Sequence, residues 1–259
     1  MIGGGKMGEA LLGGLLERGW CTSADVVVAE PDASRQIALR EAFGVTCVGS
    51  AREVNADGAV IAVKPQYVSE VCAALSGRVG RVLSIAAGVT TGQIERALAD
   101  GSIAVVRSMP NTPALVGLGA SAIAAGASAG AADLEWAESL LSSVGIVERV
   151  TEHQLDAVTG VSGSGPAYVF LMAEAMIEGG VLAGLSRATA SALVAQTIRG
   201  AGAMLATSGK DPATLRGDVT SPGGTTAAGL RALENRGVRA AFIDAVDAAT
   251  SRSRELGAS

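Results

Sequence analysis

Apolar and polar residues follow two different patterns along this chain, and the pattern changes near residue 151. In the first part, short runs rich in β-branched residues are bounded by Gly, Pro or charged side chains, as buried strands are. They predict strands at residues 26–29, 59–63, 81–85, 103–106, 120–124 and 145–150. Helix-length segments between them, such as residues 7–18 and 32–43, give the strand–helix alternation of a doubly wound parallel sheet.

From residue 152 the strand-like runs stop and long Ala-, Leu- and Met-rich segments follow. Their spacing predicts helices at residues 167–183, 186–208, 225–235 and 238–256. The sequence therefore predicts an α/β fold with two domains. Residues 1–151 form a Rossmann-type dinucleotide-binding domain, and residues 152–259 form an all-α domain.

Composition excludes several classes of protein. Apolar residues make up 49% of the chain and charged residues 17%, so a large core is available and disorder is excluded. A net charge of -5 argues against a nucleic-acid surface. Residues 115–132 carry no charge, but they are mostly Gly, Ala and Ser, so we expect a strand and loops there and no membrane span.

Cysteine and histidine usage points to a reducing compartment and to no metal site. Cys21, Cys47 and Cys72 are odd in number and lack CxxC spacing, so neither a disulfide framework nor a zinc site is expected. His153 is the single histidine. Because no signal peptide is recognisable at the glycine-rich N-terminus, we expect a cytoplasmic protein.

The segment GGGKMG fits the G-x-G-x-x-G fingerprint of dinucleotide-binding domains and opens a predicted helix. Gly3 permits the tight turn, Gly5 lets the backbone approach a pyrophosphate, and Gly8 lets the helix pack closely on the sheet. Only Met1 and Ile2 precede the motif, whereas the fold wants a central strand of about five residues there. Either the given start lies too late, which we expect, or this protein tolerates a shortened first strand.

Glu30 ends the second predicted strand, where a ribose is read in this fold. Its carboxylate would bind the 2′-hydroxyl of NAD and repel the 2′-phosphate of NADP. Ser34 or Arg35 could still hold that phosphate, so the choice between NADH and NADPH stays open. A solvated residue that begins a turn is the alternative for Glu30.

Three more segments end strands at the carboxyl edge of the sheet, where ligands of open α/β sheets bind. Lys64 in AVKP could contact cofactor or substrate, and a surface lysine is the alternative. The small residues of SIAAGVT (84–90) suit a flat nicotinamide ring close to the backbone. In RSMPNTP, Asn111 offers both a donor and an acceptor, or it only forms a turn.

Two glycine-rich turns open helices in the second half, at SGSGPA (162–167) and TSPGGTT (220–226). Bare backbone N–H groups at such a turn form an anion site that suits a substrate carboxylate. Each could also be only a well-formed helix start.

Taken in order, GGGKMG, AVKP, SIAAGVT, RSMPNTP, DAVTGVSGSGPAY and VTSPGGTTAAGL resemble the pyrroline-5-carboxylate reductase family over nearly the whole chain. The last two segments are specific to that family. The resemblance implies NAD(P)H-dependent reduction of Δ1-pyrroline-5-carboxylate to L-proline, the last step of proline biosynthesis. It also implies a homodimer through the helical domain, larger rings such as a decamer, and a substrate site near the subunit interface.

The strand ends and the resemblance together predict one set of cofactor contacts and one of substrate contacts. The expected cofactor contacts are Gly3, Gly4, Gly5, Lys6, Met7, Glu30, Ala62, Val63, Lys64, Pro65, Ala86, Ala87 and Asn111. The expected substrate contacts are Ser164, Gly224, Thr225 and Thr226. The backbone N–H groups of Gly224 and Thr225 are expected on the substrate carboxylate, and the Thr226 hydroxyl on the ring nitrogen is the expected catalytic contact. The chain departs from the family at Gly217, where an acidic residue is common, and at Glu30, where NADP-preferring members carry a small hydroxyl residue.

The expected chemistry needs little acid–base machinery, because an imine nitrogen protonates far more readily than a carbonyl oxygen. We therefore expect catalysis mainly through positioning of the hydride donor against the imine carbon, with no role for His153. A related β-hydroxyacid or cyclic-imine dehydrogenase is the alternative enzyme, but Lys210 is the only lysine after Lys64 and lies in a predicted loop. A non-catalytic dinucleotide sensor is the alternative of another class.

Overall fold

The computed structural model of the chain describes residues 1–258. They divide into two compact units. The first unit holds Met1–Ser164 and the chain from Val246 onward, and the second holds Gly165–Ala245. The predicted domain division after residue 151 stays a prediction.

Parallel strands form most of the sheet of the first unit, as predicted. The strands are β1 (Val27–Ala29), β2 (Thr46–Val48), β3 (Ala56–Ile61), β4 (Val79–Ser84), β5 (Ala104–Met109), β6 (Gly119–Ala125) and β7 (Gly145–Arg149). Two of them pair in the order β1-β2, and five in the order β3-β4-β5-β6-β7. Ile2 bridges Ala29 and Ile61 in parallel, so it stands between β1 and β3 where the central strand of the fold belongs.

One pairing differs from the all-parallel expectation, because β6 runs antiparallel to β5. The connection between them is only a short 3₁₀ turn, Thr112–Val116. A parallel crossover needs about a dozen residues and usually a helix, so this short turn can only return the chain antiparallel. The predicted α/β class with a Rossmann-type sheet is confirmed, with this reversal at its last strands.

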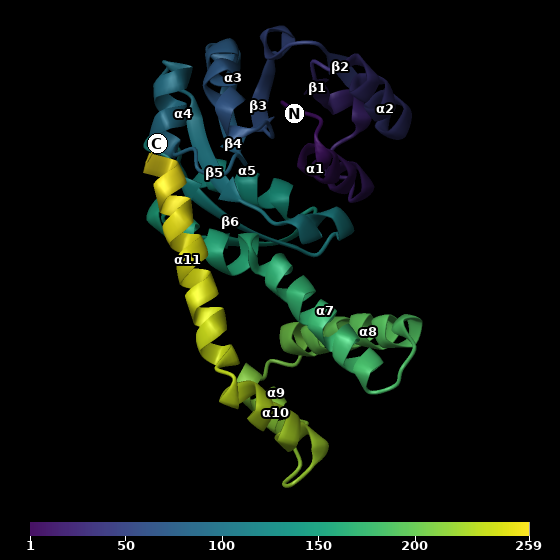
Figure 1. Cartoon of the computed structure of the whole chain (residues 1–259). Helices are drawn as coiled ribbons and strands as arrows, with labels where there is room; N and C mark the ends of the chain where they lie inside the picture. Colours follow the sequence, from purple (N-terminus) through teal and green to yellow (C-terminus); the bar gives the residue numbers. More distant parts are fainter. Residues whose placement is uncertain (259) are drawn as a thin grey trace. The chain divides into compact units, whose positions relative to one another are not determined.

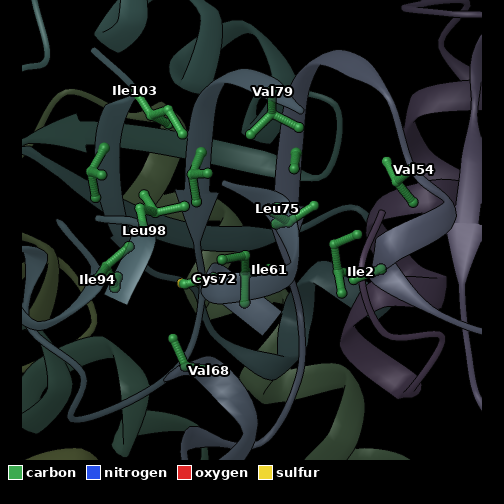
Figure 2. Packing of buried hydrophobic residues seen from close by; sticks show 14 of the residues in the cluster. Ile2, Val54, Ile61, Val68, Cys72, Leu75, Val79, Ile94, Leu98 and Ile103 are labelled. Atoms are coloured by element: carbon green, nitrogen blue, oxygen red, sulfur yellow. The ribbon is translucent and has the colours of Figure 1, made fainter. Parts of the chain in front are cut away.

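Helices cover both faces of the sheet (Figure 1). They are α1 (Lys6–Glu17), α2 (Ala33–Phe43), α3 (Val68–Leu75), α4 (Thr91–Leu98), α5 (Ala131–Leu141) and α6 (Leu155–Val158). Figure 2 shows one core layer, in which α3 and α4 pack Leu75 and Ile94 against Ile61 of β3. On the other face α1 and α5 pack Leu11 and Leu141 against the strands. Successive strand residues point to opposite layers, which explains the continuous apolar runs in the sequence.

The second unit is entirely helical, as predicted. It holds α7 (Gly165–Leu182), α8 (Arg187–Thr207), α9 (Pro212–Asp218), α10 (Thr225–Asn235) and the beginning of α11 (Val238–Ala258). Helices α7 and α8 cross in Figure 1 and make the main contact of this unit. Over the described part of the chain, no helix combines the length and the apolar character that crossing a membrane requires.

Candidate functional site

The glycine turn at the N-terminus is shaped by close backbone contacts. Gly3 has φ +98°, and a Cβ there would lie 2.7 Å from the Ala62 carbonyl oxygen. A Cβ on Gly8 would lie 2.4 Å from the Gly3 carbonyl oxygen, so helix α1 approaches the turn as closely as backbone allows. Gly5 is the N-cap of α1, and no side chain caps this helix. The first N–H groups of α1 are therefore available to an anion.

A cleft of about 550 Å³ opens beside this turn. Gly5 lines the cleft, and a Cβ at Gly5 would meet no protein atom within 4 Å. Because glycine has no side chain, this space stays open to a ligand. The other predicted cofactor residues that line the cleft are Gly3, Glu30, Ala62, Val63 and Lys64. Gly4, Lys6, Met7 and Ala86 do not line it. The dimensions and the glycine turn fit a bound dinucleotide.

Glu30 closes one side of the cleft through backbone contacts. Its Oε2 accepts a hydrogen bond from the Gly4 N–H at 2.8 Å, and its Oε1 accepts one from the Asp32 N–H at 3.0 Å. Both carboxylate oxygens are thus held at the end of β1, beside the turn. This places a fixed negative charge on the wall of the cleft.

The two residues that could have held a 2′-phosphate are engaged elsewhere. The Arg35 guanidinium donates to the Gly4 carbonyl oxygen at 2.6 Å and pairs with Glu9. The Ser34 hydroxyl donates to Asp32 at 2.6 Å. Neither residue lines the cleft.

Sequence reasoning missed part of the cleft wall, which is formed by Ser50, Ala51 and Arg52 after β2. Strand β2 spans only Thr46–Val48, so it gave no clear apolar run, and the ligand-binding edge behind it went unrecognised. The signal was the sequence Gly49-Ser50, because Ser50 accepts a hydrogen bond from Arg52 N–H and caps the short turn there.

The carboxyl ends of β3 and β4 meet at a second, adjacent cleft of about 840 Å³. Pro65 and Ala87 line it, together with Gly88. Gly88 has φ +75°, and a Cβ on it would lie 3.6 Å from Leu256 in the last turn of α11. The small residues Ala87 and Gly88 after β4 therefore form part of the wall of this cleft.

Asn111 lies outside both clefts. It follows β5 and is only 8% exposed. Its Oδ1 accepts a hydrogen bond from the Ala120 N–H at 2.8 Å, and its Nδ2 donates one to the Ser162 carbonyl oxygen at 3.0 Å. The side chain therefore joins two backbone segments that are distant in sequence.

The substrate residues expected in the helical half begin helix α10. Gly224 is its N-cap, and no side chain caps this helix end. Gly223 has φ +70°, so the turn requires glycine there, and a Cβ on Gly224 would lie 2.4 Å from the Ser221 hydroxyl. The Gly224 N–H, expected on the substrate carboxylate, donates instead to the Ser221 carbonyl oxygen at 3.0 Å, whereas the N–H groups of Thr225 and Thr226 are available to an anion such as a carboxylate. Ser164 belongs to the first unit and donates its N–H to the Thr159 carbonyl oxygen.

His153 and Lys210, the two residues considered as acid–base groups, are both exposed. His153 is exposed in a short turn, Glu152–Gln154. Lys210 is exposed between α8 and α9, and it pairs with Asp218 at 2.7 Å. Asp218, the acidic residue that follows Gly217, thus forms a surface ion pair with Lys210.

A partly buried charged cluster that the sequence did not reveal supports the edge of the sheet. Glu152 accepts hydrogen bonds from the Thr91 N–H at 2.6 Å, the Thr91 hydroxyl at 2.7 Å and the Arg107 guanidinium at 3.2 Å. Burial alone would raise the pKa of Glu152, but these hydrogen bonds outweigh it and hold the pKa below its ordinary value. The cluster joins β5, the start of α4 and the segment before α6.

Comparison with known proteins places these features in context. Residues 152–256 match the family model described as pyrroline-5-carboxylate reductase dimerisation, and residues 1–88 match the one described as NADP oxidoreductase coenzyme F420-dependent. The chain is 44% identical to a pyrroline-5-carboxylate reductase of Synechocystis over 99% of this chain and 97% of that protein.

Solved structures of the same group of enzymes superpose closely. A pyrroline-5-carboxylate reductase from Coxiella burnetii has a TM-score of 0.93 at 37% identity, over 98% of this chain and 96% of that one. A pyrroline carboxylate reductase from Plasmodium falciparum with NADP bound has a TM-score of 0.86 at 31% identity, over 99% of this chain and 96% of that one.

Proposed function

The chain belongs to the pyrroline-5-carboxylate reductase family, and from this premise we propose that it reduces Δ1-pyrroline-5-carboxylate to L-proline with NAD(P)H, the last step of proline biosynthesis. The observation that supports this function most strongly is the uncapped start of α10 at Gly224 in the family-specific SPGGTT segment, within a chain that matches such reductases over nearly its full length. Consumption of NADH or NADPH on addition of the imine tests it.

The glycine turn and its cleft fit the nucleotide. When bound, NAD(P)H supplies a hydride from C4 of the nicotinamide to the imine carbon. The N–H groups at the start of α1 would hold the pyrophosphate, because Gly5 leaves the necessary space. The small residues Ala86 and Ala87 would let the nicotinamide ring lie against backbone, and Lys6, Met7, Val63, Lys64 and Pro65 would complete the contacts.

We further propose that the chain prefers NADH to NADPH. The Glu30 carboxylate is fixed on the cleft wall by two backbone N–H groups, where it can accept hydrogen bonds from ribose hydroxyls and repel a 2′-phosphate. Arg35 is paired with Glu9 and is not among the residues that line the cleft, so it does not offset the repulsion by Glu30. A higher kcat/KM with NADH, reversed or abolished in Glu30→Ser, is the expected result. A higher kcat/KM with NADPH in the unaltered protein would refute the preference.

The substrate carboxylate would bind the N–H groups of Thr225 and Thr226 at the start of α10, with Gly224 leaving the approach open. The Thr226 hydroxyl would hydrogen-bond the ring nitrogen and orient the imine carbon toward the hydride. A hydroxyl is too weak an acid to protonate the imine, so it contributes orientation, and the iminium proton comes with the substrate. Ser164 is the remaining proposed contact of the substrate.

Thr226→Ala tests this role. We expect kcat/KM for the imine to fall by roughly 10–100-fold, since one substrate hydrogen bond and its orientation are lost. Thr207→Ala in α8 is the matched control, because among the described residues its hydroxyl bonds only to the Ala203 carbonyl oxygen of its own helix. Equal kcat and KM in Thr226→Ala and the unaltered protein would remove Thr226 from the site.

The helical unit is proposed to pair with a second copy. Among its described residues only Ala190 and Val194 are buried, while apolar side chains such as Phe170 and Leu182 are 62% and 89% exposed. Such an apolar surface needs a covering partner, and the match of residues 152–256 to the dimerisation model supports a homodimer. Assembly of dimers into a larger ring such as a decamer is a further proposal, which the mass in solution tests.

We also propose a cytoplasmic location. Cys21, Cys47 and Cys72 are all free thiols in the described residues. Burial raises the pKa of the Cys72 thiol to about 11, which keeps it protonated and unreactive. Localisation of the tagged full-length chain tests this proposal.

A further inference from the structure

Asn111 uses its amide to join two segments of the first unit. The oxygen accepts from the Ala120 N–H of β6 at 2.8 Å, and the nitrogen donates to the Ser162 carbonyl oxygen at 3.0 Å. The side chain makes no capping bond to the turn Thr112–Val116 that it precedes. An asparagine that only forms a turn would hydrogen-bond to nearby backbone, whereas the Asn111 side chain hydrogen-bonds to segments outside its own turn.

The segment that Asn111 holds is a single π-helical turn, Thr159–Gly163. Its other side is also closely packed, because a Cβ on Gly160 would lie 2.4 Å from the Thr250 hydroxyl and 2.6 Å from the Val246 carbonyl oxygen of α11. A Cβ on Gly163 would lie 2.6 Å from the Met109 side chain. Turns of this kind are rare and occur frequently at functional sites.

Ser164 follows this turn directly, and its N–H donates to the Thr159 carbonyl oxygen at 2.8 Å. The position of Ser164 relative to the carboxyl edge of the sheet is therefore set by the turn, and Asn111 is the polar side chain from that edge that fixes it. Both polar ends of an amide are needed, one as acceptor and one as donor.

We propose that Asn111 is a positioning residue for the substrate side of the site, acting through the Ser162 carbonyl on Ser164. This inference rests on the proposed function, because Ser164 is a substrate contact only if the chain is the reductase. The inference predicts different effects on substrate and cofactor. Because Asn111 lies outside the nucleotide cleft, its substitution should lower kcat/KM for the imine and leave the affinity for the nucleotide unchanged.

Asn111→Asp and Asn111→Leu in the full-length protein test the inference. An ionised carboxylate cannot donate to the Ser162 carbonyl and repels it, whereas a neutral carboxyl accepts and donates as the amide does. We expect kcat/KM for the imine to fall roughly 10–100-fold in Asn111→Asp at pH 8, with the loss relative to wild type shrinking as pH falls. Asn111→Leu should lose as much at every pH, and both variants should bind NADH within about twofold of the wild-type Kd.

Asn55→Asp is the control, because Asn55 is exposed and its side chain only meets Arg78 at 3.5 Å. It should match wild type at every pH. The positioning role is wrong if Asn111→Asp shows no recovery at low pH, if kcat/KM is unchanged, or if the NADH Kd rises as much as KM. It is also wrong if neither Asn111 variant binds NADH at any pH, since Asn111 would then serve the fold or the cofactor. An inactive wild-type protein that binds NADH would instead overturn the proposed function.

Discussion

Replacing Glu152 by glutamine removes the charge from the partly buried cluster that joins β5 to the start of α4. The glutamine would keep the shape of the side chain, and its amide oxygen could still accept from the Thr91 N–H and the Arg107 guanidinium, which both bond to Oε1. Its NH₂ could donate to the Thr91 hydroxyl, which bonds to Oε2, so the substitution removes chiefly the negative charge. The Arg107 side chain is 7% exposed and would lose its only ion pair among the described residues. The variant therefore leaves a buried charge without its partner.

The size of the loss in free energy of unfolding depends on how exposed the Glu152 and Arg107 side chains are. Breaking a buried pair on one side costs about 3–5 kcal/mol, and an exposed pair contributes about 0–1 kcal/mol. Because the Glu152 side chain is 31% exposed, water can partly replace the lost contacts. We expect Glu152→Gln to lower the free energy of unfolding by about 2–3 kcal/mol, between these limits.

Urea unfolding of the full-length protein, at equal protein concentrations, measures this loss. Glu138→Gln is the matched control, because its pair with Arg149 is 38% and 44% exposed, and we expect it to cost less than about 1 kcal/mol. Equal urea midpoints for Glu152→Gln and Glu138→Gln would refute the reasoning.

The same cluster predicts a pH dependence. Since the pKa of Glu152 is lower in the folded protein than in the unfolded chain, its stabilisation is complete above the unfolded pKa of about 4.3 and is lost as pH falls through the folded pKa. The stability gap between wild type and Glu152→Gln should therefore be constant from neutral pH to about pH 5 and should narrow in more acidic solution. If this difference in stability narrowed already above pH 6, a group other than Glu152 would be responsible for it.

Single features of the structure give three more predictions. Gly5→Ala should weaken NADH binding at least about tenfold, because the new Cβ meets no protein atom and enters only the cleft. The urea midpoint should stay within error. An unchanged Kd for NADH in a titration would refute the proposed position of the pyrophosphate. Ser108→Ala should raise the free energy of unfolding by up to about 1 kcal/mol, because the Ser108 hydroxyl is buried without a hydrogen-bond partner in the described residues; a lower urea midpoint would contradict this. The melting temperature should rise with protein concentration, because the helical unit buries only Ala190 and Val194 by itself; a constant value across a hundredfold range would argue against a dissociable dimer.

The first unit shows which parts of the fold a single sequence reveals. Buried strands such as β4 and β5 are continuous apolar runs, so their place was predicted, with boundaries shifted by a few residues at most. Strand β2 is too short to show a pattern. The antiparallel turn before β6 could not be predicted from strand pattern, because the direction of β6 depends on the length of the connection and not on its apolar residues.

The candidate site was predictable where glycines impose geometry. Gly3 and Gly223 occupy positive φ, and the sequence motifs mark both turns. Side chains whose role depends on distant partners were not predictable. Glu152 and Arg107 are 45 positions apart in the chain, and Asn111 and Ser162 are 51 apart, so only the folded chain brings each pair together.

Transfer of deuterium tests the central claim most directly. The full-length protein is incubated with Δ1-pyrroline-5-carboxylate and NADH or NADPH that carries deuterium at nicotinamide C4 on the transferred face, and the product is analysed by mass and NMR spectroscopy. The proposed function predicts L-proline with one deuterium at C5, formed in equal amount to the oxidised cofactor. Oxidised cofactor without labelled proline, or no reaction with either cofactor from protein that binds NADH, would contradict it.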